Sequence, residues 1–221
     1  MSVSVRLVLG LAAAVAALAL FLWLADFVED KAAVPFDASV RGWVHAHSNP
    51  TLTSFMRLMS LIGSPAFLVA FSLIAFLILL RVAHWPREAL LFLVAMTGGF
   101  VLDGVLKVVF HRARPPSYCG TPEPASYSFP SGHASAAFFA AALLRDGAPA
   151  PLVYVAAATV ASSRVHVGMH HASDVVAGAI VGAALGEVAR HLFPIVPRAS
   201  GTGPGPASPA DQEQSSPTRR L

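Results

Sequence analysis

The sequence predicts an all-α integral membrane protein: a bundle of six transmembrane helices with a short interfacial helix and a disordered C-terminal tail. Of its 221 residues, 55% are hydrophobic and only 12% are charged, whereas about a quarter of the residues in an average soluble domain are charged. Several apolar stretches approach the ~20 residues that a helix needs to cross a hydrocarbon layer. The remaining polar residues gather between these stretches.

These apolar stretches place one membrane domain in residues 1–193. Residues 194–221 are rich in Pro, Gly and Ser and are expected to form a disordered cytoplasmic tail. The first apolar stretch is long for a signal peptide and has no small-residue cleavage site, so we expect a retained helix. The six spans are expected at about 5–25, 61–81, 88–110, 131–145, 150–163 and 173–193.

Two segments before the third span carry further signals. Ser64-Pro65 is a good cap and first turn for the second span, and residues 52–62 could lengthen that span. In residues 36–47, apolar side chains recur at helical spacing with charged residues between them. This pattern fits two interpretations about equally well: a helix lying in the membrane interface and an irregular loop.

The distribution of basic residues predicts the orientation of the bundle. With six spans both termini lie on one side, and cytoplasmic loops carry an excess of Lys and Arg. Outside three motif cations described below, the terminal side holds eight basic residues: Arg6, Arg81, Arg87, Arg145, Arg190, Arg198, Arg219 and Arg220. The other side holds four: Lys31, Arg41, Arg57 and Arg112. Both termini are therefore expected in the cytoplasm, with the loops at 25–60, 111–130 and 163–173 facing outward.

The unusual polar residues converge at these outward ends in three groups. Lys107 is followed after six residues by Arg114-Pro115; Pro130-Ser131-Gly132-His133 open the fourth span; Ser163-Arg164, His170 and Asp174 connect the last two. In order and spacing these groups resemble the three signature motifs of the type 2 phosphatidic acid phosphatase superfamily, which includes vanadium haloperoxidases and glucose-6-phosphatases. The resemblance covers roughly residues 60–193.

This resemblance implies a metal-independent lipid phosphatase that works through a phosphohistidine, with no cofactor. His170 would be the nucleophile, Asp174 would hold its other ring nitrogen, and His133 would act as general acid and base. Vanadate is expected to inhibit as a phosphate mimic. The implied phosphate ligands are Lys107, Arg114, Ser131, Gly132 and Arg164.

Physical chemistry supports these roles independently. Phosphoryl transfer is catalysed mainly by positioning and by fixed positive charge around the nonbridging oxygens. Two arginines can grip oxygens bidentately while a lysine acts as a point charge, and a helix start at Ser131-Gly132 offers free N–H groups to an anion. Because one histidine must start neutral and the other protonated, the rate should have a bell-shaped pH profile.

Several neighbouring residues have other interpretations. We expect Asp103 to pair structurally with Lys107 four residues later, and His111 and Arg112 to be solvated loop or headgroup contacts. His166 and His171 flank His170, and only the motif spacing distinguishes the three. A metal site from these histidines and His133 is disfavoured by the three cations beside it. Cys119, the single cysteine, is expected to be a passive loop residue.

The last span carries a small-residue pattern. Asp174, Gly178, Gly182 and Gly186 repeat every four residues and share one helix face. Glycines on one face allow two helices to approach closely, which would turn Asp174 toward the interior of the bundle.

Three functions are compatible with these features. A lipid phosphate or diphosphate phosphatase is favoured, with polyprenyl diphosphate, phosphatidylglycerol phosphate and phosphatidic acid as candidate substrates. The alternatives are a phosphatase of the same fold acting on a soluble ester, and a noncatalytic scaffold or transporter with a vestigial site. The scattered basic residues do not indicate nucleic-acid binding. The Ala- and Arg-rich composition suggests a bacterial plasma membrane, and the sequence does not specify an oligomeric state.

Overall fold

The computed structural model describes residues 3–82, 86–116, 125–145 and 148–192, and within these ranges all regular structure is helical. This confirms the all-α prediction. The expected tail at 194–221 and Cys119 lie outside the described residues. The elements are α1 (Val3–Glu29), α2 (Val34–Ala46), α3 (Pro50–Ile62), α4 (Pro65–Leu77), a π-helical turn η1 (Ile78–Val82), α5 (Pro86–Phe110), α6 (Gly132–Leu144), α7 (Ala150–His166) and α8 (Ala172–Leu192).

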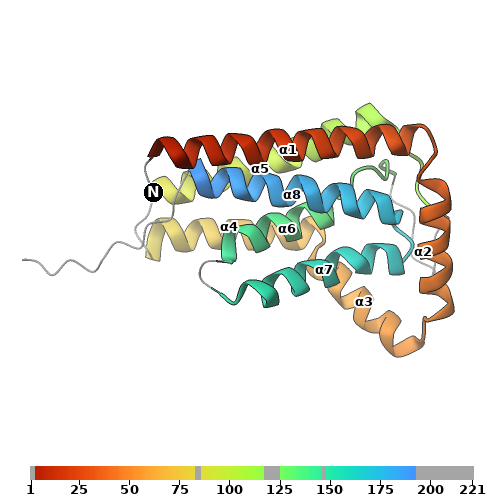
Figure 1. Cartoon of the computed structure of the whole chain (residues 1–221). Helices are drawn as coiled ribbons and strands as arrows, with labels where there is room; N and C mark the ends of the chain where they lie inside the picture. Colours follow the sequence, from red (N-terminus) through yellow and green to blue (C-terminus); the bar gives the residue numbers. More distant parts are fainter. Residues whose placement is uncertain (1–2, 83–85, 117–124, 146–147, 193–221) are drawn as a thin grey trace, which may run out of the picture.

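The long helices lie roughly along one axis, and α2 crosses one end of the bundle almost at right angles to α1 (Figure 1). The end of α7 and the start of α8 meet at the end that α2 crosses. The side chain of Asp37 on α2 accepts two hydrogen bonds from Ser173 in the first turn of α8, which ties the crossing helix to the bundle. The end of the bundle beneath α2 is therefore where the three motif groups come together.

Two of the described helices are long and apolar enough to cross a membrane, at Val8–Glu29 and Ala172–Arg190. They correspond to the first and last of the expected spans. The total of six spans stays a prediction.

Helix α2 occupies the segment in which sequence patterns left a helix and a loop equally favoured. Its outer face exposes apolar side chains, with Phe36 at 46% and Trp43 at 64% exposure. Its inner face carries Asp37, which is only 6% exposed. The helix is therefore amphipathic, as an interfacial helix requires, but its buried face holds a carboxylate.

The suggestion that residues 52–62 lengthen the second span is wrong. Helix α3 ends at Ile62, directly before Gly63, and slants away from the bundle axis (Figure 1). A Cβ at Gly63 would lie 2.7 Å from the His133 ring and 2.8 Å from Val160, so a larger residue at this turn would have to displace one of these side chains. Helix α4 then starts as predicted, with the Ser64 hydroxyl accepting a hydrogen bond from the Phe67 amide at 3.3 Å.

Helix α7 also extends further than the sequence indicated. The expected span stopped at residue 163, yet the helix continues to His166. Ser163 and Arg164 therefore lie on a helical turn rather than in a polar loop, and both are buried. A helix holds the Arg164 backbone more firmly than a loop would.

The glycine face of α8 packs directly against α6, as the four-residue repeat predicted. A Cβ at Gly178 would lie 2.3 Å from the Ser131 carbonyl oxygen, and one at Gly182 would lie 2.0 Å from the Ser135 carbonyl oxygen. At Gly186 it would lie 2.5 Å from the Ala142 methyl group. Asp174, on the same face, is completely buried.

Replacing Gly182 by alanine should destabilise the protein strongly. The new methyl group meets backbone rather than a movable side chain, so the helices must separate, and overpacking of this kind costs about 1–3 kcal/mol or more. Thermal unfolding in detergent should show a lower midpoint for Gly182→Ala than for Gly98→Ala, because Gly98 has no atom within 4 Å of an added Cβ. Equal midpoints would contradict the close α6–α8 contact.

Candidate active site

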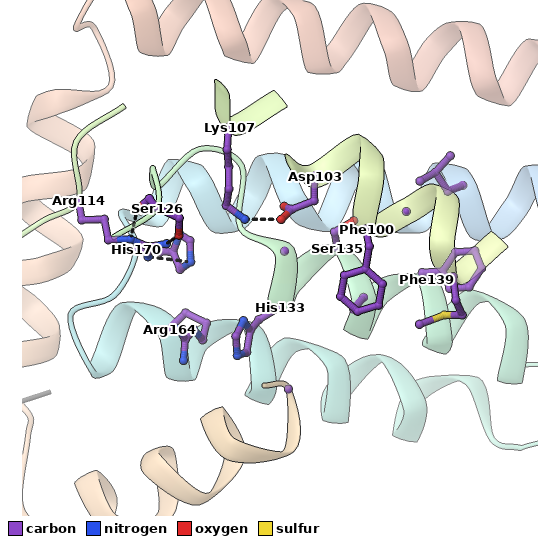
Figure 2. Close-up of a pocket in the computed structure, with 16 residues that line it drawn as sticks. Phe100, Asp103, Lys107, Arg114, Ser126, His133, Ser135, Phe139, Arg164 and His170 are labelled. Atoms are coloured by element: carbon purple, nitrogen blue, oxygen red, sulfur yellow. Dashed lines mark hydrogen bonds and ion pairs between the residues drawn. The ribbon is translucent and has the colours of Figure 1, made fainter. Parts of the chain in front are cut away.

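A cavity of about 320 Å³ lies between α5, α6, the end of α7 and the connecting loops. Six of the eight predicted site residues line it: Lys107, Arg114, Gly132, His133, Arg164 and His170. The other two, Ser131 and Asp174, are fully buried directly behind it. Figure 2 shows Arg114 beside His170 at one end, His133 next to Arg164, and the rings of Phe100 and Phe139 at the other end.

His170 lies in the short connection between α7 and α8 and is 3% exposed. Its Nδ1 is 2.8 Å from the Ser128 carbonyl oxygen, and its Nε2 is 3.3 Å from Nη1 of Arg114. A carbonyl only accepts and a guanidinium only donates. These partners therefore assign the proton to Nδ1 and leave the Nε2 lone pair directed toward the cations, which is the form that a nucleophilic histidine requires.

Asp174 contacts His170 differently from the expectation. Its Oδ2 is 3.6 Å from Nδ1 of His170 and accepts a hydrogen bond from the His171 amide at 2.8 Å. The closer partner of Nδ1 is Ser128, which the sequence analysis did not identify. A backbone carbonyl leaves no residue-type signal in a sequence, and Asp174 acts on the ring mainly through its charge.

The surroundings of His170 favour its neutral form. Burial lowers the pKa of His170 to about 4, and the charges of Arg114 and Arg164 act in the same direction. The Asp174 carboxylate raises the pKa but does not compensate. His170 is therefore uncharged, with an unprotonated Nε2, at any pH near neutrality.

Arg114 is oriented by several acceptors in the connecting loops. It donates to the Ser126 carbonyl at 2.7 Å, the Met169 carbonyl at 2.6 Å and the Tyr127 carbonyl at 3.1 Å. Most of its donors are thus engaged by the protein, which fixes the plane of the guanidinium beside His170. A charge fixed in this way needs no reorganisation when an anion arrives.

Arg164 projects from the last turn of α7 and is 8% exposed. Its Nη1 donates to the Ser60 hydroxyl on α3. The same two helices are also joined by Thr53, whose hydroxyl is 3.0 Å from Nε2 of His166. Helix α3, which was expected only as a possible extension of the second span, therefore positions Arg164.

Lys107 forms the predicted ion pair with Asp103, one turn earlier on α5 (Figure 2). The carboxylate also lies against the start of α6, because a Cβ on Gly132 would be 2.9 Å from both of its oxygens. Glycine at 132 therefore makes room for Asp103. The pair lies between the cationic and the apolar ends of the cavity.

The anion site expected at Ser131-Gly132 has fewer free backbone amides than predicted. The Ser131 amide donates to the Asp174 carbonyl at 3.0 Å, so it is not available to a phosphate oxygen. Ser131 is the N-cap of α6, and among the described residues its buried hydroxyl has no hydrogen-bond partner. The amides that follow Ser131 remain at the positive end of the helix.

The prediction that Arg112 is a solvated loop residue is wrong. Its side chain is 15% exposed and forms ion pairs with Asp37 and Asp174. His111 is exposed, as expected, and its ring packs edge-on against Tyr127 with centroids 4.7 Å apart. Their positions between the motif residues gave no reason to expect different environments for His111 and Arg112, whereas the tertiary contacts show that only Arg112 is held by ion pairs.

The other histidines considered in the sequence lie apart from the cavity lining. His166 contacts Thr53, and Nδ1 of His171 is 4.0 Å from Asp37. Burial lowers the pKa of His171, and the charge of Arg112 lowers it further. In the described part of the chain, no three His, Cys, Asp or Glu side chains are arranged to hold a metal ion.

A buried neutral histidine facing fixed cations, in a cavity that continues between apolar helices, is an arrangement suited to phosphoryl transfer. The comparison with known proteins agrees. Residues 88–197 match the PAP2 superfamily. A decaprenylphosphoryl-5-phosphoribose phosphatase of Mycobacterium tuberculosis is 35% identical over 118 residues, which is 51% of this chain and 67% of that protein.

Two further similarities extend the comparison. An undecaprenyl-diphosphatase of Sulfolobus acidocaldarius is 39% identical over 90 residues, covering 37% of this chain and 44% of that protein. The crystal structure of a transmembrane PAP2 type phosphatidylglycerolphosphate phosphatase from Bacillus subtilis superposes with a TM-score of 0.70 at 27% identity, covering 84% of this chain and 98% of that one. The chain belongs to the PAP2 superfamily and is a membrane phosphoric ester hydrolase.

The rate should fall on the acid side near pH 4 rather than near the usual histidine value of 6.5. Only neutral His170 has a free lone pair, and its lowered pKa keeps it neutral until the pH drops to about 4. A profile of kcat/KM from pH 3.5 to 9 locates this limb. His47→Gln, which changes an exposed histidine at the same end of the bundle, should leave it in place. An acid limb between pH 6 and 7 would contradict the environment described for His170.

Proposed function

We propose that this protein removes phosphate from a lipid-borne phosphate monoester or diphosphate through a phosphohistidine on His170. The substrate headgroup would enter from the outer face of a bacterial plasma membrane, with both termini of the protein in the cytoplasm. No cofactor takes part in this proposal.

The observation that carries the proposal is the two-ended lining of the cavity. One end holds Arg114 and Arg164 around His170. Lys107 lies between this end and the apolar one. The other end is lined by Met96, Phe100, Phe139 and Leu185 from α5, α6 and α8. A phosphate on a long apolar chain matches both ends at once, whereas a soluble ester would leave the apolar end empty.

The geometry suggests how the reaction proceeds. Nε2 of His170 attacks phosphorus, and the bond from phosphorus to the leaving oxygen breaks. Arg114, whose Nη1 is 3.3 Å from the attacking nitrogen, can hold a nonbridging oxygen beside it. Positive charge that develops on the ring is stabilised by Asp174 at 3.6 Å and by the Nδ1 hydrogen bond to Ser128.

His133 is the proposed general acid and base. It lies on the first turn of α6 and lines the cavity opposite Asp103. Its Nε2 is buried and has no hydrogen-bond partner in the described part of the chain, which leaves this nitrogen available to the leaving oxygen. After the leaving group departs, the same nitrogen can activate the water that attacks the phosphohistidine.

The similar proteins narrow the choice of substrates to assay. They are named for a decaprenylphosphoryl phosphoribose, an undecaprenyl diphosphate and phosphatidylglycerol phosphate. These substrates share a terminal phosphate on a long-chain lipid and differ in what links the two. The motifs do not encode this link, so we include all three together with phosphatidic acid.

Purified protein in detergent and EDTA should release phosphate from at least one of these lipids, and His170→Ala should release none. The loss follows because the substitution removes the proposed nucleophile. His47→Ala serves as the matched histidine control and should keep wild-type rates. Mass spectrometry of the His170 peptide after rapid quenching should detect the added phosphate in wild type.

The alternatives give different results in the same assay. Equal or faster hydrolysis of a short-chain or sugar phosphate would favour a soluble substrate. Release by both wild type and His170→Ala would show that another residue is the nucleophile. Inactivity toward every phosphate ester would favour a scaffold or transporter with a vestigial site.

The proposed orientation can be tested with the single cysteine of the chain. Cys119 belongs to the loop expected outside the cell, so a membrane-impermeant maleimide should label it in intact cells. A variant carrying Cys119→Ser and Ser208→Cys moves the thiol to the tail and should be labelled only after lysis. The reverse pattern would overturn the topology.

A further inference from the structure

Arg112 joins two buried carboxylates that come from distant parts of the chain. Its Nη2 is 2.7 Å from Oδ2 of Asp37, and its Nη1 ion-pairs with Oδ1 of Asp174. Nη1 also donates to the Ser173 hydroxyl at 2.8 Å. The guanidinium therefore stands between α2 and the first turn of α8.

Asp37 directs both of its oxygens to this same place. Oδ1 accepts from the Ser173 amide at 2.9 Å, and Oδ2 accepts from the Ser173 hydroxyl at 2.8 Å as well as from Arg112. Ser173 directly precedes Asp174. Helix α2 is thus fastened to the residue next to the carboxylate that faces His170.

Burying such charges is expensive if the only purpose is to attach a helix. Desolvation of a buried ion pair often offsets its attraction, and well-packed apolar side chains of the same volume hold helices at least as firmly. Asp37 is 6% exposed and Asp174 is not exposed at all. What apolar side chains could not do is fix the position and the effective charge of Asp174.

We propose that Asp37 and Arg112 are positioning residues for His170, acting through Asp174. Arg112 limits how much of the negative charge of Asp174 reaches the imidazole. Asp37 shares the charge of Arg112 and holds Ser173 in place. We call this pair the Asp37–Arg112 clamp. The proposal rests on His170 being the nucleophile, as argued above.

The charged groups around His170 define what the clamp can change. Lys107 approaches from α5, Arg114 from the loop after it, His133 from α6, Arg164 from α7 and Asp174 from α8, with His171 adjacent in the chain. Asp174 opposes the cations at the ring. Any change in how strongly Asp174 is neutralised must therefore move the titration of His170.

Substitutions of the two members of the clamp should affect this titration differently. Arg112→Gln leaves Asp174 without its cation, so its full charge acts on the ring and the pKa of His170 rises. Asp37→Asn leaves the charge of Arg112 to Asp174 alone, so the pKa of His170 does not rise. Two substitutions that merely loosened the fold would not differ in this way.

Both substitutions should also reduce kcat more than they raise KM, because neither residue lines the cavity. A misplaced reacting group can cost on the order of 10²-fold in rate, and we expect a loss approaching this size for Arg112→Gln. Ser39→Ala on the exposed side of α2 and Asp30→Asn beyond α1 are the matched controls and should behave as wild type.

The experiment measures kcat and KM from pH 3.5 to 9 for each variant in detergent, on the lipid that wild type cleaves best. In parallel, acylation of His170 by diethylpyrocarbonate, which reacts with neutral imidazole, is followed by peptide mass spectrometry at pH 5 and pH 7. The second measurement needs no substrate. If wild type cleaves no lipid, the proposed function fails while the titration of His170 still tests the clamp.

A lower kcat in both variants, with an acid limb that moves to higher pH for Arg112→Gln but not for Asp37→Asn, is the expected result. An unmoved limb in Arg112→Gln, an upward shift in both, or wild-type kcat in both would overturn the clamp. If either variant does not elute as folded protein, Arg112→Lys and Ser173→Ala replace them. A lysine lacks the planar fork through which Arg112 pairs with Asp37 and Asp174 by separate nitrogens, so wild-type kcat in these milder variants would equally reject the proposal.

Discussion

Close backbone contact between α6 and α8, made through the glycine face of α8, is the constraint on which the active end of the bundle depends. Because no side chains separate the two helices there, the Ser131 amide reaches the Asp174 carbonyl at 3.0 Å. The start of α6 and the start of α8 are therefore locked together. This contact brings His133 on α6 close to Asp174 on α8 and to His170, which lies just before α8.

The cationic side chains at this end of the bundle differ in the kind of acceptor that holds them. Arg114 is oriented by carbonyl oxygens and Arg164 by a serine hydroxyl. Neutral acceptors orient a guanidinium without cancelling its charge, so both keep their attraction for an anion. Lys107 is held by a carboxylate at the cavity, and Arg112 is held by two carboxylates away from it. The kind of hydrogen-bond partner therefore separates the two arginines that can attract an anion, Arg114 and Arg164, from Arg112, whose charge is balanced by carboxylates.

Much of this organisation could be predicted from the sequence. Apolar length and the spacing of the three motifs identified the helical bundle, the buried face of α8 and six residues that line one cavity. What escaped prediction depends on tertiary contacts. Ser128 acts through a backbone carbonyl, which any residue supplies. Arg112 and Asp37 are 75 residues apart, and nothing local indicates that their charges meet. The break at Gly63 follows from the nearness of His133 and Val160, which the sequence does not show.

The part of the chain that matches the superfamily begins at residue 88. Asp37 on α2, which anchors Arg112, and Ser60 on α3, which orients Arg164, both lie before it. The three motifs therefore lie within the matched part of the chain, whereas some of the residues that hold the motif side chains in place lie before it. A relative can keep every motif residue and still differ in catalytic rate through changes in the helices that correspond to α2 and α3. For proteins built in this way, an intact set of motifs indicates which reaction is catalysed but not how fast it proceeds.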